Sequence, residues 1–413
     1  MDILVIGNGF DLAHGLPTRY SDFLTFLHEI RNLVIKNEGK HFDNNQDILN
    51  KLQVKEFVDN YFKNVFSTEE SAYLVVNKLQ DKIINNIWVT FFQTVYSNKS
   101  ISGQNWIDFE QEIKKIIMAM YTFRKKLGSL CFDSFYKGEI PSNLTEGNEL
   151  LIDDNVLLPV YSVINASTTK LRLRSIDYEL LKRRMRIDLS RFIEAMDIYF
   201  GFFVKGFSTN VILPDFARRE VFKHVLSFNY VNNYERFYCS EEAKIRTCYV
   251  HGNTRCGNFI SNNLGIKNNM VLGFEEYLSG TDKDNDLEFV YYKKYFQRIL
   301  KGTGNEYLSW LKLGEDDMTA NDPDALMAGE IDLNHKNHIY IFGHSLDITD
   351  REVLRELILR DSVKTTIYYH DEEAHERLIL NLIKIIGQEQ LITKTHGNPP
   401  DIEFVKQRPP SNN

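Results

Sequence analysis

Three residues near the start of the chain, Gly7, Asn8 and Gly9, follow directly on the continuous apolar run 3–6. A strand that ends in Gly-x-Gly can turn sharply and lets a diphosphate approach the main chain, with the following backbone N–H groups facing the anion. The usual dinucleotide fingerprint has a third glycine where this chain has Leu12. The pattern alone is therefore weak support for nucleotide binding.

Other residues able to bind or react with a ligand also follow short apolar runs. Asn229 follows HVLSF, His251 follows RTCYV, and Gly343 follows HIYIF. Runs of this kind are typical of buried parallel strands, and KTTIYYH at 364–370 has the same character. Because ligand sites in an open α/β sheet gather at the carboxyl ends of strands, these distant segments are expected to converge on one crevice.

Helix signals follow two of these strands. Thr349 and Glu352 have the spacing of a capping box before the stretch 349–360. The stretch 371–387 begins with acidic residues and ends at a glycine. Asp350, just inside the first of these helices, is expected only to complement the helix dipole. The alternation of strand, polar turn and helix predicts an open parallel sheet.

The middle of the chain has mostly helical periodicity from about residue 45 to about 215, as in the stretch 72–96. We therefore predict a discontinuous α/β domain over 1–44 and 216–405, with a helical insertion domain over 45–215. The stretch 170–192 is rich in Arg and Lys. We expect it to be a solvated helix face, because acidic residues are spaced among the basic ones, with a phosphate-contacting surface as the alternative.

The spacing of the first loop carries a resemblance. The first loop resembles the opening loop of the sirtuin superfamily: Gly7-Asn8-Gly9 is followed, after five residues, by Gly15-Leu16-Pro17. In sirtuins Gly-Ala-Gly precedes Gly-Ile-Pro at the same interval, and this loop wraps around NAD. Asn8 replaces the alanine, Asp11 replaces a serine, and the arginine that follows in sirtuins is displaced. In the same order, SFNY (227–230) and VHG (250–252) look like the strand ends with the catalytic asparagine and histidine. FGHSLDITD (342–350) looks like the late Gly-x-Ser loop against the adenosine end of the cofactor.

A narrower resemblance covers most of the chain. Five segments together resemble the bacterial abortive-infection AbiH family: GNGFDLAHGLPTRYSDFL, FNY, HGN, KKYFQRI (293–299) and IFGHSLDITD. That family is associated with defence against bacteriophage. The resemblance implies a sirtuin-like, Rossmann-type open parallel sheet with a large helical insertion, and NAD as substrate or ligand.

The resemblance also implies roles for particular residues. His251 would be the base, since an imidazole titrates near neutral pH. Asn229 would orient a water or the ribose hydroxyls, and Asp11 would either stabilise positive charge on the ribose or cap the next turn. The expected cofactor-binding residues are Gly7, Asn8, Gly9, Phe10, Gly15, Leu16, Pro17, Tyr230, Gly252, Gly343, Ser345 and Leu346. His14 and His344 border these loops and are expected to be packing or rim residues.

Hydrolysis of NAD is the first functional hypothesis. Sirtuins that deacylate proteins usually carry a zinc module of two Cys-x-x-Cys pairs, and this chain has neither. Water is then the simpler acceptor, which predicts an NAD glycohydrolase that acts in phage defence. A sensor that binds NAD, NADP, ADP-ribose or a signalling nucleotide without turnover is the alternative. A nucleic-acid effector that acts through 170–192 is a further alternative.

Composition bounds these hypotheses. The 413 residues are 43% hydrophobic and 26% charged, with a net charge of −8, so nucleic acid is an improbable general partner. The four cysteines form no Cys-x-x-Cys pair, and no metal is expected. No apolar run is long enough to span a bilayer, so we expect no membrane association and a cytoplasmic location. Self-association and an unidentified phage-derived trigger are further expectations.

Overall fold

A computed structural model describes residues 1–52, 54–68, 71–127, 145–146, 149–150, 178–207, 209–216, 222–240, 243–255, 268–275, 278, 285–310, 337–360, 363–409 and 411–412. The chain divides into two compact units. The α/β unit comprises Met1–Thr18, Ser208–Asn253 and Lys301–Asn413. The helical unit comprises Arg19–Phe207 and Thr254–Leu300.

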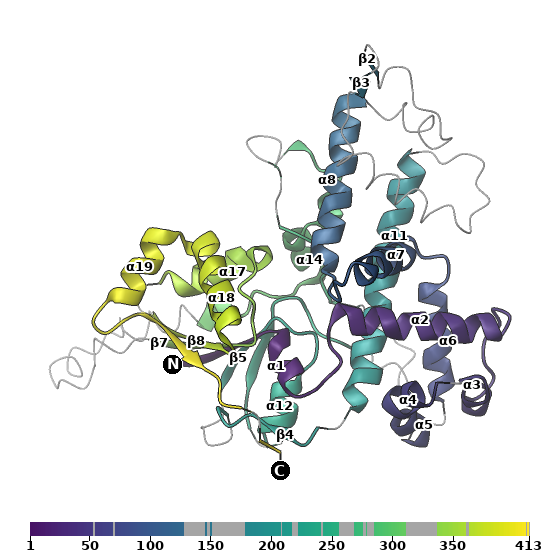
Figure 1. Cartoon of the computed structure of the whole chain (residues 1–413), viewed down its shortest axis with the longest axis horizontal. Coiled ribbons are helices and arrows are strands. Elements are labelled where there is room, and N and C mark those ends of the chain that lie inside the picture. Colours follow the sequence, from purple (N-terminus) through teal and green to yellow (C-terminus); the bar gives the residue numbers. More distant parts are fainter. Residues whose placement is uncertain are drawn as a thin grey trace. The chain divides into compact units, whose positions relative to one another are not determined.

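The α/β unit is built on a parallel sheet of six strands in the order β6-β5-β1-β7-β8-β9. Figure 1 labels β5, β7 and β8 of this sheet. Numbered by their succession along the chain, these strands have the order 3-2-1-4-5-6 of the Rossmann fold. The strands are β1 (Asp2–Ile6), β5 (His224–Ser227), β6 (Arg246–Tyr249), β7 (Asn337–Phe342), β8 (Val363–Tyr369) and β9 (Ile402–Lys406). The predicted α/β class and open parallel sheet are confirmed, and β9 is a strand that the sequence analysis did not predict.

The helices of this unit follow the strands. They are α1 (Asn8–Ala13), α12 (Asn233–Tyr238), α17 (Arg351–Ile358), α18 (Glu372–Ile386) and α19 (Gln388–His396), with a short 3-10 turn η7 (Ile348–Asp350) before α17. A separate antiparallel pair joins β4 (Val211–Ile212) to β10 (Ser411–Asn412).

The predicted capping box at Thr349 is wrong. Thr349 lies inside η7, where its backbone N–H donates to the side chain of Asp347, and α17 begins only after Asp350. The acidic start and the glycine end predicted for α18 are confirmed. Asp371 accepts from the Ala374 backbone N–H at 2.7 Å, and Gly387 ends the helix with φ 89°.

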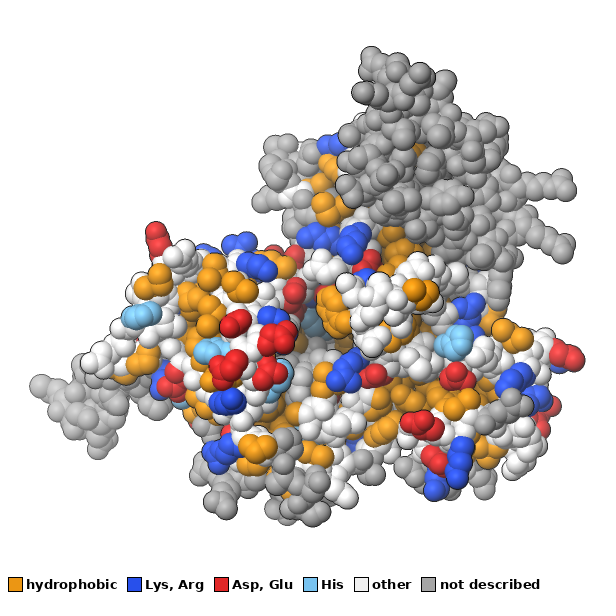
Figure 2. Space-filling view, in the orientation of Figure 1, with side chains coloured by type: hydrophobic (Ala, Val, Ile, Leu, Met, Phe, Trp, Pro, Cys, Tyr) orange, Lys and Arg blue, Asp and Glu red, His pale blue; other side chains and the backbone are white. Residues whose placement is uncertain are grey.

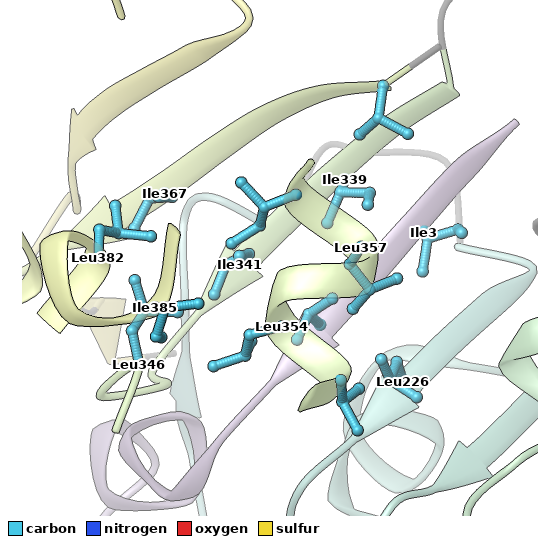
Figure 3. Close-up of a cluster of buried hydrophobic side chains, with 14 of the residues drawn as sticks. Ile3, Leu226, Ile339, Ile341, Leu346, Leu354, Leu357, Ile367, Leu382 and Ile385 are labelled. Atoms are coloured by element: carbon cyan, nitrogen blue, oxygen red, sulfur yellow. The ribbon is translucent and has the colours of Figure 1, made fainter. Parts of the chain in front are cut away.

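Both faces of the sheet are buried, which explains why its strands read as continuous apolar runs. Alternate residues of each strand point to opposite faces. On one face, Ile3, Leu226 and Ile341 pack with Leu354 of α17 and Leu382 of α18 (Figure 3). On the other face, a second cluster joins the strands to α1 and α12, and its members include Leu4, Ile6, Val225, Phe342, Phe10 and Tyr234.

The helical unit packs around aromatic side chains. Phe23 contacts Phe192 and Tyr199, while Phe92 stacks on Phe109. Its elements are α2 (Tyr20–Lys36), α3 (Asn45–Lys51), α4 (Lys55–Phe57), η1 (Val58–Phe62), α5 (Lys63–Thr68), α6 (Ala72–Ile83), α7 (Ile87–Ile101), α8 (Phe109–Leu127), β2 (Thr145–Glu146), β3 (Glu149–Leu150), α11 (Tyr178–Ile198), η3 (Tyr199–Phe203), η4 (Val204–Gly206), η6 (Val290–Tyr292) and α14 (Lys294–Lys301).

The units differ from the predicted domain boundaries in three places, one of which is that residues 208–215 belong to the α/β unit, where β4 pairs with β10. The helix α2 belongs with the helical unit, where it packs against α6 and α7. The segment Thr254–Leu300 also belongs there, through contacts such as the ion pair between Lys294 and Glu110. The stretch 72–96 forms two helices rather than one, since Asn86 caps α7 after a break at residues 84–86.

Candidate functional site

Polar side chains gather where four strands of the α/β unit end. Asp11 lies in α1 after β1, and Asn229, His251 and His344 each lie two residues beyond the ends of β5, β6 and β7. The strands β1 and β7 are neighbours at the point where the strand order reverses. In open α/β sheets, ligands bind at the carboxyl ends of the strands beside such a switch point.

The glycines of the first loop pack against the loop that follows β7. A Cβ atom on Gly7 would lie 2.7 Å from the Gly343 carbonyl oxygen, and one on Gly9 would lie 2.8 Å from the Gly343 Cα. The Gly7 N–H donates to the Phe342 carbonyl, and the Gly9 N–H donates to the Gly343 carbonyl. Close packing of two backbones therefore accounts for these glycines. Their predicted role in holding a diphosphate stays a prediction.

Asp11 is the buried carboxyl of the site. Its side chain accepts a hydrogen bond from Asn233 Nδ2 at 3.0 Å, and the residue is 2% exposed. Burial raises the pKa of Asp11 from 3.8 to about 7, against the lowering effect of side-chain hydrogen bonds from Asn233 and Asn229. Asn229 also donates from Nδ2 to the Gly7 carbonyl at 3.0 Å. The structure thus joins the end of β5 to the first loop.

A second group consists of two histidines on either side of one carboxylate. His251 Nε2 lies 3.1 Å from Asp350 Oδ1, and His344 Nε2 lies 3.4 Å from Asp350 Oδ2. All three residues are buried. The Phe228 ring lies edge-on to both imidazoles, with centroids 5.5 Å from His251 and 4.2 Å from His344. A buried carboxylate favours a proton on the nitrogen that faces it, which leaves the lone pair of a neutral His251 on Nδ1.

His344 is held in one tautomer. Its Nδ1 accepts a hydrogen bond from the Leu346 backbone N–H at 2.9 Å, so a neutral ring carries its proton on Nε2, toward Asp350. Leu346 has a φ of 55°, a conformation that is rare for a leucine. The hydrogen bond to His344 and the burial of the leucine side chain hold this turn. The second imidazole is therefore a fixed neighbour of Asp350.

The sequence of the chain matches one known family. The family model described as bacteriophage abortive infection AbiH matches residues 3–370. The chain belongs to the AbiH family. No curated protein and no solved structure matches it. The AbiH match spans every polar residue of the site described above and confirms the family predicted from the motifs.

The remaining predicted residues of this AbiH chain lie in different environments. Phe10 and Leu346 are core residues, one on each face of the sheet, and Leu16 is also buried. Tyr230 and Gly252 are buried beside the ends of β5 and β6, and Pro17 is partly buried. Asn8, Gly15 and Ser345 are exposed. Exposure leaves these last three accessible to a ligand.

Three site residues were missed or misassigned from the sequence. Asp350 contacts two histidines, which the predicted dipole role did not anticipate. His344 belongs to the same buried group and packs against Phe228, so only the rim position, one of the two expectations for it, is wrong. Asn233, the partner of Asp11, stands four residues after Asn229, which is the one sequence signal that could have indicated it. By contrast, His14 is the packing residue expected, bonded to the Phe10 carbonyl and the Tyr238 hydroxyl.

The basic stretch of the AbiH chain is described from residue 178 onward. Arg184 and Arg191 bind the buried carboxylate of Asp188, and both donate to backbone carbonyls between α6 and α7. Lys182 pairs with Glu288. On the face shown in Figure 2, described Lys and Arg side chains are scattered among Asp and Glu. These contacts favour the structural interpretation over a surface that binds nucleic acid.

The described part of the chain holds no group of three or more His, Cys, Asp or Glu side chains placed to bind a metal ion. Cys239 and Cys248 form no disulfide among the described residues, while Cys131 and Cys256 lie outside them. None of the described helices combines the length and the apolar character that a membrane span requires.

Proposed function

We propose that this AbiH-family chain hydrolyses the nicotinamide–ribose bond of NAD and so depletes an infected cell of the cofactor. The family's role in abortive infection by bacteriophage supplies the biological setting. The proposal extends the sirtuin-like character of the motifs to the chemistry. It depends chiefly on one observation: Asn229, from the end of β5, bonds to Gly7 in the loop after β1.

In this reaction the bond between the ribose carbon and the nicotinamide nitrogen breaks, and a water oxygen bonds to that carbon. The transition state resembles an oxocarbenium ion, so a nearby anion stabilises it. His251 accepts the proton of the water, and Asp350 positions the imidazole and stabilises the imidazolium. Asp11, whose pKa is about 7, supplies negative charge when ionised. Asn229 orients the water or the ribose hydroxyls.

The alternative function is a sensor that binds a nucleotide without cleaving it. The burial of Asp11, Asn229 and His251 favours this alternative, because a ligand must open the site before it reaches these side chains. The N–H groups of Gly7 and Gly9 are also used within the fold. Ligand binding would then rearrange the two loops, which is a change that a partner protein could detect.

Incubation of the full chain with NAD tests the proposal. We expect nicotinamide and ADP-ribose in equal amounts by chromatography, with an infected-cell extract added in case a trigger is required. His251→Ala and Asn229→Ala should lose turnover but keep NAD binding by calorimetry. Wild-type protein that binds NAD and releases no nicotinamide in either condition would establish the sensor instead. Protein that binds no nucleotide would overturn both functions.

A further inference from the structure

The helix α14 of the helical unit buries its polar side. Lys294, Gln297 and Arg298 are buried, while Ile299 and Leu300 are 72% and 67% exposed. The spacing i, i+3, i+4 places the three polar residues on one helix face. Helices at protein surfaces ordinarily have the reverse arrangement. Because burial of polar groups is unfavourable unless they find partners, each of these side chains requires one.

Two of the three have partners within the chain. Lys294 Nζ lies 2.8 Å from Glu110 Oε2, which neutralises its charge. Gln297 donates from Nε2 to the carbonyls of Leu272 and Tyr291, at 2.8 Å and 2.9 Å, and its Oε1 accepts from the Leu272 N–H at 3.0 Å. These contacts explain why the two side chains point inward.

Arg298 is the exception. The residue is 7% exposed, and its Nε and Nη2 atoms are buried with no hydrogen-bond acceptor in the part of the chain that the structure describes. A guanidinium keeps its positive charge at every physiological pH. An uncompensated buried charge is strongly unfavourable, so this arrangement calls for an anion.

We propose that Arg298 anchors a binding site for a phosphate-type oxyanion. The Nε and Nη2 atoms form one edge of the planar guanidinium, and two parallel N–H groups on that edge match two oxygens of a phosphate. The site lies in the helical unit and does not depend on NAD hydrolysis. Its ligand is inorganic phosphate or pyrophosphate, or the phosphate portion of a nucleotide.

Thermal unfolding of the full chain tests this site. In phosphate-free buffer of constant ionic strength, pyrophosphate should raise the melting temperature of the wild type in a saturable way. Arg298→Met should remove this shift and weaken pyrophosphate binding at least about tenfold by calorimetry, since a bidentate charged contact is lost. Without ligand, Arg298→Met should melt no lower than wild type, because the substitution removes an uncompensated charge. Arg183→Met, which changes an exposed arginine of α11, is the matched control and should keep the full shift.

Several outcomes separate the possible causes. A wild type with no saturable shift, or an Arg298→Met variant that retains it, overturns the site. An equal shift with acetate overturns the assignment to phosphate, whereas ADP that acts at lower concentration than pyrophosphate supports a nucleotide source. If Arg298→Met fails to fold, Arg298→Lys serves instead. It keeps the positive charge but lacks the two parallel N–H groups, so it should bind pyrophosphate more weakly than the wild type. His251→Asn should lose NAD turnover but keep the pyrophosphate shift, which separates this site from the proposed function.

Discussion

The Nε2 atom of His251 lies 3.1 Å from Oδ1 of Asp350, and the second oxygen of that carboxylate faces His344. Asp350, which ends the short turn before α17, therefore contacts a residue just beyond the end of β6. The pair places a buried carboxylate behind an imidazole, which is the arrangement that holds a general base in position.

The proposed NAD hydrolysis predicts that Asp350→Asn lowers turnover by about 100-fold, within the range that general acid–base catalysis supplies. The affinity for NAD should change little, because Asp350 acts through His251. The acidic limb of the pH–rate profile should move to lower pH, since the imidazolium loses the carboxylate that stabilises it. Steady-state kinetics between pH 5 and 9 would measure both effects.

Asp347→Asn is the matched control for this prediction. Asp347 lies in the same turn, and an asparagine oxygen can still accept from the Thr349 N–H. Its turnover and pH profile should stay close to those of the wild type. Equal losses in both variants would mean that the turn as a whole, rather than the contact between Asp350 and His251, maintains activity.

The raised pKa of Asp11 predicts how stability depends on pH. The folded chain keeps a proton on this carboxyl up to about pH 7, whereas the unfolded chain releases it near the usual value of 3.8. The stability linked to that proton is fully present below pH 3.8 and is lost as the pH rises to about 7. The loss amounts to at most about 4 kcal/mol.

Asp11→Asn should therefore gain stability relative to wild type as the pH rises from 5 to 8, as measured by urea unfolding. Asp371→Asn is a control of opposite sign, because the hydrogen bond from the Ala374 N–H lowers the pKa of Asp371. The stability that ionised Asp371 contributes is fully present above pH 3.8 and is lost as the pH falls below that value, so the difference between Asp371→Asn and wild type should stay constant from pH 5 to pH 8. A stability difference for Asp11→Asn that is the same at pH 5 and pH 8 would contradict the assignment.

Gly343 should tolerate no side chain. A Cβ atom there would lie 2.2 Å from the Phe10 nitrogen, and the residue has a φ of 66°. Gly343→Ala should lose at least about 3 kcal/mol of stability or fail to accumulate as folded protein. Gly15 has a φ of 74° but open space around its Cα, so Gly15→Ala should lose only about 1 kcal/mol. Similar losses for the two variants would show that backbone conformation, not the contact between the loops, requires glycine.

Asp188 should be the main stabilising residue of the basic stretch. Its buried carboxylate binds Arg184, Arg191 and the Ile87 N–H. Asp188→Asn leaves both arginines uncompensated and should lower the free energy of unfolding by about 3 kcal/mol. Glu194→Gln, which breaks a more exposed pair with Lys82, should change it by at most about 0.5 kcal/mol. Urea unfolding would compare the two, and equal effects would contradict the central role of Asp188.

The sheet could be predicted from the sequence because its strands are buried on both faces. A continuous apolar run such as Ile3–Ile6, followed at once by a glycine, is typical of a strand that is covered on both sides. The strand β9 was missed, because its sequence IEFVK mixes charged and apolar residues at the sheet edge. The position of α2 could not be predicted, since its apolar face fits a sheet or other helices equally well.

The site was predictable only in part. Asn229 and His251 follow strands, and that position alone indicates a candidate ligand site. Asp350 ends the turn η7, whose first residues are held by Asp347, so its contact with two histidines arises from tertiary structure. Among the described residues, Nε and Nη2 of Arg298 have no hydrogen-bond acceptor. This also could not be predicted, because the motif KKYFQRI does not show which side of the helix is buried.

The strand order has a consequence for biosynthesis. The two neighbours of β1 in the sheet are β5 and β7, which begin at His224 and Asn337. At roughly 5–20 residues per second, the ribosome needs on the order of tens of seconds between emergence of the first strand and emergence of its second neighbour. Until β5 emerges, β1 has no neighbour with which to pair, and its other edge stays unpaired until β7 emerges. The nascent chain must keep this apolar segment from aggregating until most of the protein has been translated.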